Sequence, residues 1–321
     1  MSTDLKKLFT KYSEHMLRGD VGLSENDGLA GKMFETLLSI AGPDIAGRPE
    51  FFLDTKLSTG TAIAPRDAAT CMTDIVRTSR YVLGLRNAVI EMRARFPNQR
   101  VDILYAGCGP FAAIALPLCH EFTADEISFT LVDLHEASLA SAKRVFDALG
   151  IGKFVAEWLC ADASAVVPSK KYQIIVAETM QKALEKEPQV AVTIHLSDFL
   201  HADGIFLPEK ITVTACLADL NVEFGSGARN ERIVLGDICT LTKDTDEIEP
   251  VAMTIPDIQT DGLSLLLATS IQIFDSVGLG DRESGITHPS IIFDTGSLKP
   301  GDNIEFKYRM GAEPRFVCRV V

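Results

Sequence analysis

The sequence predicts an α/β domain that lies between an N-terminal helical region and a C-terminal all-β region. Three patterns along the 321 residues support this prediction. Helical periodicity dominates residues 1–99, compact apolar strands alternate with helices over residues 100–206, and short β-rich segments separated by turn residues fill residues 207–321. We take these three ranges as the domains of the chain.

The N-terminal region consists of helical segments. The apolar residues of "DLKKLFTKYSEHML" and "GLAGKMFETLLSIAG" have helical spacing, and so do those of a longer third segment, residues 66–96. A loop rich in glycine, threonine and proline, residues 54–65, precedes this third segment. We therefore expect one long helix over 66–96.

The central region alternates between strands and helices. Strands are expected at "VDILYAG", "ISFTLVDL", "FVAEWLCAD" and "YQIIVAE", and a helix is expected at "PFAAIALPLCHEF". This alternation favours a parallel sheet with helices on both faces. Ligands bind such sheets at the carboxyl ends of the strands, so we look for the site there.

The C-terminal region loses its helical signals after "GIFLPEKITV" (204–213). Segments such as "RIVLGDICTLT" and "LSLLLATSIQIFDSVGL" are separated by turns of Gly, Asp, Asn and Pro. Short strands in this arrangement predict an antiparallel barrel or sandwich.

Composition argues against several classes of protein. The hydrophobic content of 46% allows a sizeable buried core, while the formal net charge of −13 argues against binding to nucleic acid phosphates. The longest apolar runs are shorter than the roughly 20 residues that cross a membrane, and the N-terminus lacks a signal-peptide core. The seven cysteines and six histidines form no CxxC or HExxH motif, so we expect no metal site and a reduced, cytoplasmic setting.

A glycine-rich loop follows the first predicted strand of the α/β domain. In "ILYAGCGPFAA", Gly107 and Gly109 let backbone amides approach a bound ligand closely. The string fits both the dinucleotide pattern GxGxxA and the loop that holds the methionine part of S-adenosylmethionine. Asp133 and Asp162 end the next two strands, where carboxylates are placed to accept ribose hydroxyls and to reach an adenine edge. Asp133 alone is also compatible with an acid at a helix N-terminus.

Two glutamates follow the fourth predicted strand. Glu178 and Glu187 lie nine positions apart in "AETMQKALEKEP". On one continuous helix this spacing is two and a half turns, which points the side chains to opposite sides. A shared target therefore requires a bend between them. Glu185 is an alternative second carboxylate, and each glutamate alone is also compatible with an acid at a helix start or in solvent.

The spacing of Glu178 and Glu187 resembles the "double-E" loop of the protein arginine methyltransferases. Further strings resemble that family in the same order: "DIVRT" (74–78), "DGIFLPEKITV" (203–213), "THP" (287–289) and "SLKPGDNIEFKYRM" (297–310). The resemblance covers roughly residues 66–321. It implies a class I S-adenosyl-L-methionine-dependent methyltransferase: a Rossmann-type domain with N-terminal helices and a C-terminal β-barrel.

The resemblance also implies how the cofactor is bound. Arg77 is expected to pair with the carboxylate of the methionine moiety, Gly107 and Gly109 to line that moiety, and Asp133 to hold the ribose. Asp162 completes the expected cofactor site from the third strand.

The substrate side of the site follows from the same resemblance. Glu178 and Glu187 are expected to grip a guanidinium, while His288 lies across the pocket, paired with Asp74. That pair either orients the ring as a general base or ties the N-terminal helix to the barrel. We expect the tie to be its main role.

The resemblance implies that the substrate is the guanidino group of arginine. The short β region and the altered loops, including Thr179–Lys182 and Pro289, favour free L-arginine or a small guanidino metabolite over protein arginine. Alternatives are a protein arginine methyltransferase, a methyltransferase for another cationic acceptor and an NAD-dependent oxidoreductase. A binding protein without catalysis is a further alternative, because Tyr105 replaces an acid that the resembling family commonly has before its glycine loop and Pro289 replaces an aromatic residue. A homodimer is a further expectation, although the β region is short for the family's dimerisation arm.

Overall fold

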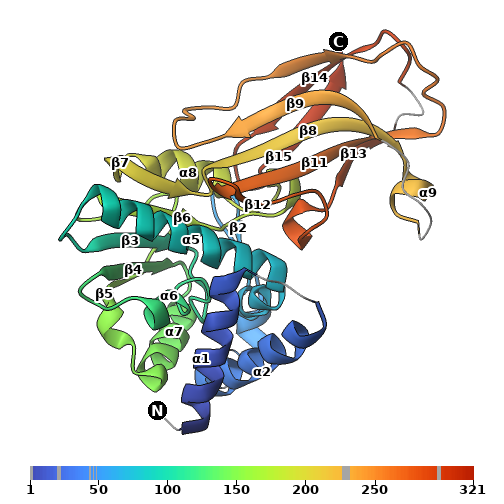
Figure 1. Cartoon of the computed structure of the whole chain (residues 1–321). Coiled ribbons are helices and arrows are strands. Elements are labelled where there is room, and N and C mark those ends of the chain that lie inside the picture. The colour runs from blue at the N-terminus through green and yellow to red at the C-terminus, as the bar shows by residue number, and fades with distance from the viewer. Residues whose placement is uncertain are drawn as a thin grey trace.

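The computed structural model describes most of the chain, namely residues 3–19, 23–42, 45, 47, 49–225, 232–294 and 298–321. Figure 1 shows an α/β layer next to the N-terminal helices and a β region above it. Ser297, the first residue of the "SLKPGDNIEFKYRM" string, lies outside the described residues. Within them, no helix combines the length and the apolar composition needed to cross a membrane.

Two helices, α1 (Thr3–Arg18) and α2 (Leu23–Ala41), open the chain. In α1, Phe9, Tyr12 and Met16 are buried, which is the spacing of one apolar helix face. This face packs against α2, α5 and α7 and joins the N-terminal region to the α/β core.

The segment that follows approaches the sheet in short pieces. Its elements are η1 (Pro49–Phe52), β1 (Thr55–Lys56), β2 (Thr61–Ala62), α4 (Pro65–Thr70), η2 (Cys71–Thr73) and α5 (Ile75–Arg95). The single helix expected over 66–96 is therefore wrong, because the chain breaks at Asp74. The Asp74 carboxylate accepts a hydrogen bond from the Arg77 backbone N–H at 3.1 Å and begins a new helix there.

The central sheet has five parallel strands in the order β5-β4-β3-β6-β7. Their bounds are β3 (Val101–Ala106), β4 (Ile127–Asp133), β5 (Val155–Cys160), β6 (Tyr172–Ala177) and β7 (Leu200–Leu207). Alternate residues of β3 join two separate hydrophobic clusters, one packed on α8 (Gln189–Ser197) and one on α5 and α7 (Glu136–Leu149). The predicted Rossmann-type sheet with helices on both faces is confirmed.

The chain after β3 is less helical than expected. The only helix within "PFAAIALPLCHEF" is the four-residue α6 (Leu118–Glu121), and turns occupy most of residues 107–117. Pro110 and Pro117 cannot donate backbone hydrogen bonds, and Ala112 has a φ of 47°. The glycine loop is therefore continued by further turns before α6 begins.

The C-terminal region is antiparallel. Its elements are β8 (Lys210–Asp219), α9 (Leu220–Glu223), β9 (Ile233–Leu241), β10 (Val251–Thr254), β11 (Leu263–Phe274), β12 (Val277–Leu279), η5 (Gly285–Thr287), β13 (Ser290–Asp294), β14 (Asn303–Arg309) and β15 (Arg315–Val320). One sheet has the order β12-β11-β8-β9, with β13 also paired to β11, and the other has the order β10-β14-β15. Two antiparallel sheets are compatible with the expected C-terminal β-barrel.

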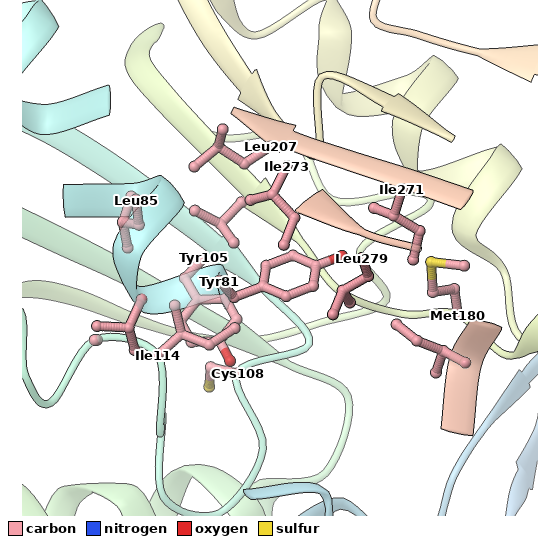
Figure 2. Close-up of a cluster of buried hydrophobic side chains, with 14 of the residues drawn as sticks. Tyr81, Leu85, Tyr105, Cys108, Ile114, Met180, Leu207, Ile271, Ile273 and Leu279 are labelled. Carbon is pink, nitrogen blue, oxygen red and sulfur yellow. The ribbon is translucent and has the colours of Figure 1, made fainter. Parts of the chain in front are cut away.

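The β region packs directly on α5. A Cβ atom added to Gly84 would lie 2.5 Å from Ile273 Cγ2, so this contact requires glycine. Figure 2 shows the apolar cluster at this junction, where Tyr81 and Leu85 of α5 lie near Ile273 of β11 and Leu279 of β12. The junction fixes α5 between the parallel sheet and the β region.

Candidate functional site

One cavity lies at the carboxyl ends of the parallel strands, between α5 and the loops after β3, β4, β5 and β6. It contains about 1080 Å³ of empty space, part of it open to solvent. Seven residues that the sequence singled out line this cavity: Arg77, Gly107, Gly109, Asp133, Asp162, Glu178 and Glu187. Residues from five separate segments are thus brought together, as binding at the carboxyl edge of a parallel sheet requires.

The glycine loop forms one wall of the cavity. Gly107 and Gly109 have φ values of 70° and 64°, in the left-handed region that favours glycine. A Cβ atom at Gly107 would lie only 2.6 Å from Thr179 Cγ2. The missing side chain therefore lets the glycine loop meet the segment that begins with Glu178.

Two aspartates form the wall at the ends of β4 and β5. Asp133 accepts hydrogen bonds from the backbone N–H groups of Gly109 and His135, each at 2.9 Å. Asp162 accepts from the backbone N–H and the hydroxyl of Ser164, at 2.8 and 2.7 Å. A carboxylate has about four acceptor positions, so both side chains can still accept hydrogen bonds from ligand hydroxyls or amines.

Arg77 and Glu178 form an ion pair inside the cavity. Arg77 Nη1 lies 3.2 Å from Glu178 Oε1, and Arg77 Nη2 donates to the Cys71 carbonyl at 2.9 Å. The guanidinium has five N–H donors, so others stay available to a ligand anion. Arg77 thus connects α5 to the loop that carries the glutamates.

Both glutamates bind their protons more tightly than exposed carboxylates do. Burial raises the pKa of Glu178, and Arg77 opposes that rise. Glu187 is only 7% exposed, and burial followed by the negative charge of Glu178 raises its pKa to about 8. The negative charge of Glu178 therefore disfavours ionisation of Glu187 in the same site, and a bound cation would favour it.

The loop between the glutamates contains the bend that a shared target requires. Ala183, Leu184 and Lys186 have φ values of 52°, 55° and 65°, which are strained for residues with side chains. Such backbone persists only where the surroundings hold it in place.

Three hydrogen bonds from the β region hold this strained loop. The Thr269 hydroxyl accepts from the Ala183 N–H at 2.9 Å, and the Tyr308 hydroxyl donates to the Leu184 carbonyl at 2.8 Å. The Pro314 carbonyl accepts from the Lys186 N–H at 2.9 Å. The β region therefore sets the loop conformation without lining the cavity.

Gln189 supports the site from outside the cavity lining, and the sequence did not predict this role. Its side chain is fully buried, and its Oε1 accepts from the Thr179 N–H at 2.9 Å and the Thr179 hydroxyl at 3.1 Å. This bridge joins the residue after Glu178 to the start of α8, just after Glu187. Only a folded loop brings these ends together, so the sequence carried no local signal for it.

The alternative second carboxylate, Glu185, points elsewhere. Its Oε2 accepts a hydrogen bond from the Ser290 hydroxyl at 3.3 Å, next to a separate hollow between β13 and β15. Glu185 is absent from the lining of the main cavity, whereas Glu178 and Glu187 both contribute to it.

The expected pairing of Asp74 with His288 is wrong. Asp74 Oδ2 instead accepts from the Ser284 hydroxyl at 2.6 Å and from the Gly285 N–H at 3.1 Å. His288 is exposed, and neither it nor Asp74 lines the cavity. The start of α5 is linked to the β region, as expected, but the link is made by the Ser284 hydroxyl and not by His288. The η5 turn directs His288 outward.

A cover hairpin, which we define as residues 54–62, spans the cavity. The Thr55 hydroxyl hydrogen-bonds to His135 Nε2 at 3.0 Å, and the Thr59 hydroxyl hydrogen-bonds to the Ser164 hydroxyl at 2.8 Å. On the opposite side, the Thr61 N–H donates to the Lys186 carbonyl at 2.7 Å. The sequence predicts only a loop here, because these contacts are with segments far along the chain.

Comparisons with known proteins identify the fold. No protein-family model matches the sequence, and no curated protein matches it. A chain of the Trypanosoma brucei PRMT1 enzyme–prozyme heterotetrameric complex with AdoHcy is 13% identical, with a TM-score of 0.55 over 78% of this chain and 91% of its own. Arabidopsis thaliana protein arginine methyltransferase 10 is 12% identical, with a TM-score of 0.55 over 74% of this chain and 85% of its own. The chain therefore has the fold of the protein arginine methyltransferase-like class I S-adenosylmethionine-dependent methyltransferases.

Proposed function

We propose that the protein is an S-adenosylmethionine-dependent N-methyltransferase that acts on the guanidino group of arginine. The observation that carries this proposal is the position of Glu178 and Glu187, which line the same cavity as the glycine loop and Arg77. Both carboxyl groups are buried, and the positive charge around them is too small to balance two negative charges. A planar cation bound between them would supply that charge. The fold of the chain agrees with this activity.

The cavity residues fit the cofactor. Gly107 and Gly109 line the cavity without side chains that would obstruct a ligand, and the free acceptor positions of Asp133 and Asp162 would serve a ribose and an adenine edge. Arg77 keeps N–H donors for the carboxylate of the methionine moiety. When bound, S-adenosylmethionine would supply a methyl group activated by the positive sulfur.

The two glutamates would prepare the nucleophile. A guanidinium is protonated at ordinary pH and is therefore a poor nucleophile. Glu178 and Glu187 would accept its N–H groups in charge-assisted hydrogen bonds, which draw positive charge toward the bonded nitrogens and orient the remaining nitrogen. Holding the reacting groups in line can contribute on the order of 7–11 kcal/mol.

We favour free L-arginine or a small guanidino metabolite over arginine in a protein. The cover hairpin supports this choice, since Leu57 and Ala62 line the cavity and its hydrogen bonds reach loops on both sides. A protein acceptor would have to pass its backbone beside this hairpin. A homodimer and a cytoplasmic location stay predictions.

The test has two parts. In a thermal-shift assay, S-adenosylhomocysteine should raise the Tm, whereas NADH should not. Methyl transfer from labelled S-adenosylmethionine is then measured with free arginine, short arginine peptides and small guanidines. Methylation of peptides but not of free arginine would contradict the preferred substrate, and stabilisation by NADH alone would contradict the proposed function.

A further inference from the structure

A tyrosine hydroxyl in the cavity has no partner within the described part of the chain. Tyr81 is fully buried on α5 and lines the cavity, yet its hydroxyl neither donates nor accepts a hydrogen bond there. A buried polar group left without a partner costs about 1–3 kcal/mol, so such groups call for an explanation. A ligand that reaches the hydroxyl would supply one.

Tyr81 is placed to act together with Arg77. The two residues lie four positions apart on α5, which puts their side chains on the same helix face, and both line the cavity. Arg77 supplies N–H donors there, and Tyr81 adds an O–H donor one turn further along. Two donors side by side suit a carboxylate, which has several acceptor positions.

The hydroxyl of Tyr81 stays protonated. Burial and then the negative charge of Glu178 raise the pKa of Tyr81, and the same two causes raise the pKa of Tyr105, a neighbouring cavity residue. Because Tyr105 stays protonated, the end of β3 places no negative charge beside an incoming carboxylate. The donors of Tyr81 and Arg77 are therefore the groups that would bind a ligand anion at this end of the cavity, next to the negative charge of Glu178.

We propose that the Tyr81 hydroxyl binds the α-amino-acid end of the cofactor, where it donates a hydrogen bond to the carboxylate beside Arg77. This inference rests on the proposed function and adds a positioning residue to it. The adenosine part of the cofactor, at Asp133 and Asp162, would not depend on Tyr81.

The test compares two ligands and two variants. S-adenosylhomocysteine carries the amino-acid end, whereas 5′-methylthioadenosine retains the adenosine and the thioether without it. Their affinities are measured by calorimetry for the wild type, Tyr81→Phe and Tyr12→Phe. Tyr12 is the matched control, because its buried hydroxyl also has no partner among the described residues and it does not line the cavity.

Tyr81→Phe should weaken S-adenosylhomocysteine binding on the order of tenfold, the effect of losing one hydrogen bond to a charged group. Its affinity for 5′-methylthioadenosine should not change, and its Tm without ligand should be equal to that of the wild type or higher. Tyr12→Phe should bind both ligands as the wild type does.

Unchanged binding of S-adenosylhomocysteine by Tyr81→Phe would overturn the inference and leave the proposed function standing. Equal losses for both ligands would also overturn it, because they would mean a general change in the cavity. If the wild type bound neither ligand, the proposed function and this inference would fail together.

Discussion

The α/β part of the molecule and the C-terminal β region contribute to the site in different ways. Every residue that lines the cavity belongs to residues 57–192, including all its acids and its arginine. The β region instead holds the loop between Glu178 and Glu187 from behind, through Thr269 and Tyr308. One part supplies the chemical groups, and the other stabilises the strained backbone that presents them.

This division predicts the largest effects for the two glutamates that line the cavity. Glu178→Gln and Glu187→Gln keep the side-chain shape but remove the charge, so each should lower turnover at least about a hundredfold, as the loss of a strong electrostatic partner does. Steady-state methyl transfer to the preferred guanidine measures this. Glu185→Gln is the matched control, because Glu185 faces Ser290 and should retain near wild-type turnover. Wild-type rates in the first two variants would show that no carboxylate clamp exists.

The pKa of Glu187 predicts how guanidine binding depends on pH. Since that pKa is about 8, Glu187 is mostly protonated at pH 7, and binding a cation between the acids should release a proton. Affinity should rise from pH 6 to pH 8 and level off above it, because the guanidinium itself does not titrate in this range. Calorimetry in two buffers with different ionisation enthalpies measures the proton release. Glu187→Gln should remove it, and a flat profile in the wild type would contradict the assignment.

The raised pKa of Glu187 also determines whether the folded state becomes more or less stable as pH rises. The folded state holds this proton more tightly than the unfolded state, in which the pKa is about 4.5. The contribution of Glu187 to stability therefore falls as pH rises from about 4.5 to about 8. Urea unfolding across this range should show a smaller decline for Glu187→Gln than for the wild type.

The smallest effect on turnover is expected when a hydrogen bond from the β region to the loop is removed. Tyr308→Phe removes the hydrogen bond to the Leu184 carbonyl, which should cost about 1 kcal/mol of stability and lower turnover roughly two- to tenfold as the loop relaxes. Tyr172→Phe is the control, because its buried hydroxyl bonds to Thr130 within the parallel sheet. Tyr172→Phe should lose about as much stability as Tyr308→Phe, and its turnover should not change. Equal turnover in the two variants would mean that the β region does not hold the loop.

The site could be predicted in large part because several of its residues follow strand ends. Gly107, Asp133, Asp162 and Glu178 each stand at or just after the end of a strand, so one correct prediction of a parallel sheet places them together. Gln189 and Ser284 could not be found this way. Their partners, Thr179 and Asp74, lie across turns whose path depends on tertiary contacts.

The periodicity of the sequence by itself determined the parallel sheet and the change to antiparallel strands, because these depend on local patterns of side chains. The candidate carboxylates came from their spacing together with the resemblance to the arginine methyltransferases. Only the tertiary structure decided that Ser284 replaces His288 as the partner of Asp74, that Glu187 rather than Glu185 faces the cavity, and that a hairpin covers it. These choices depend on positive φ angles and on hydrogen bonds between distant segments. Their free energy is gained only when the whole chain has folded, and local sequence does not encode it.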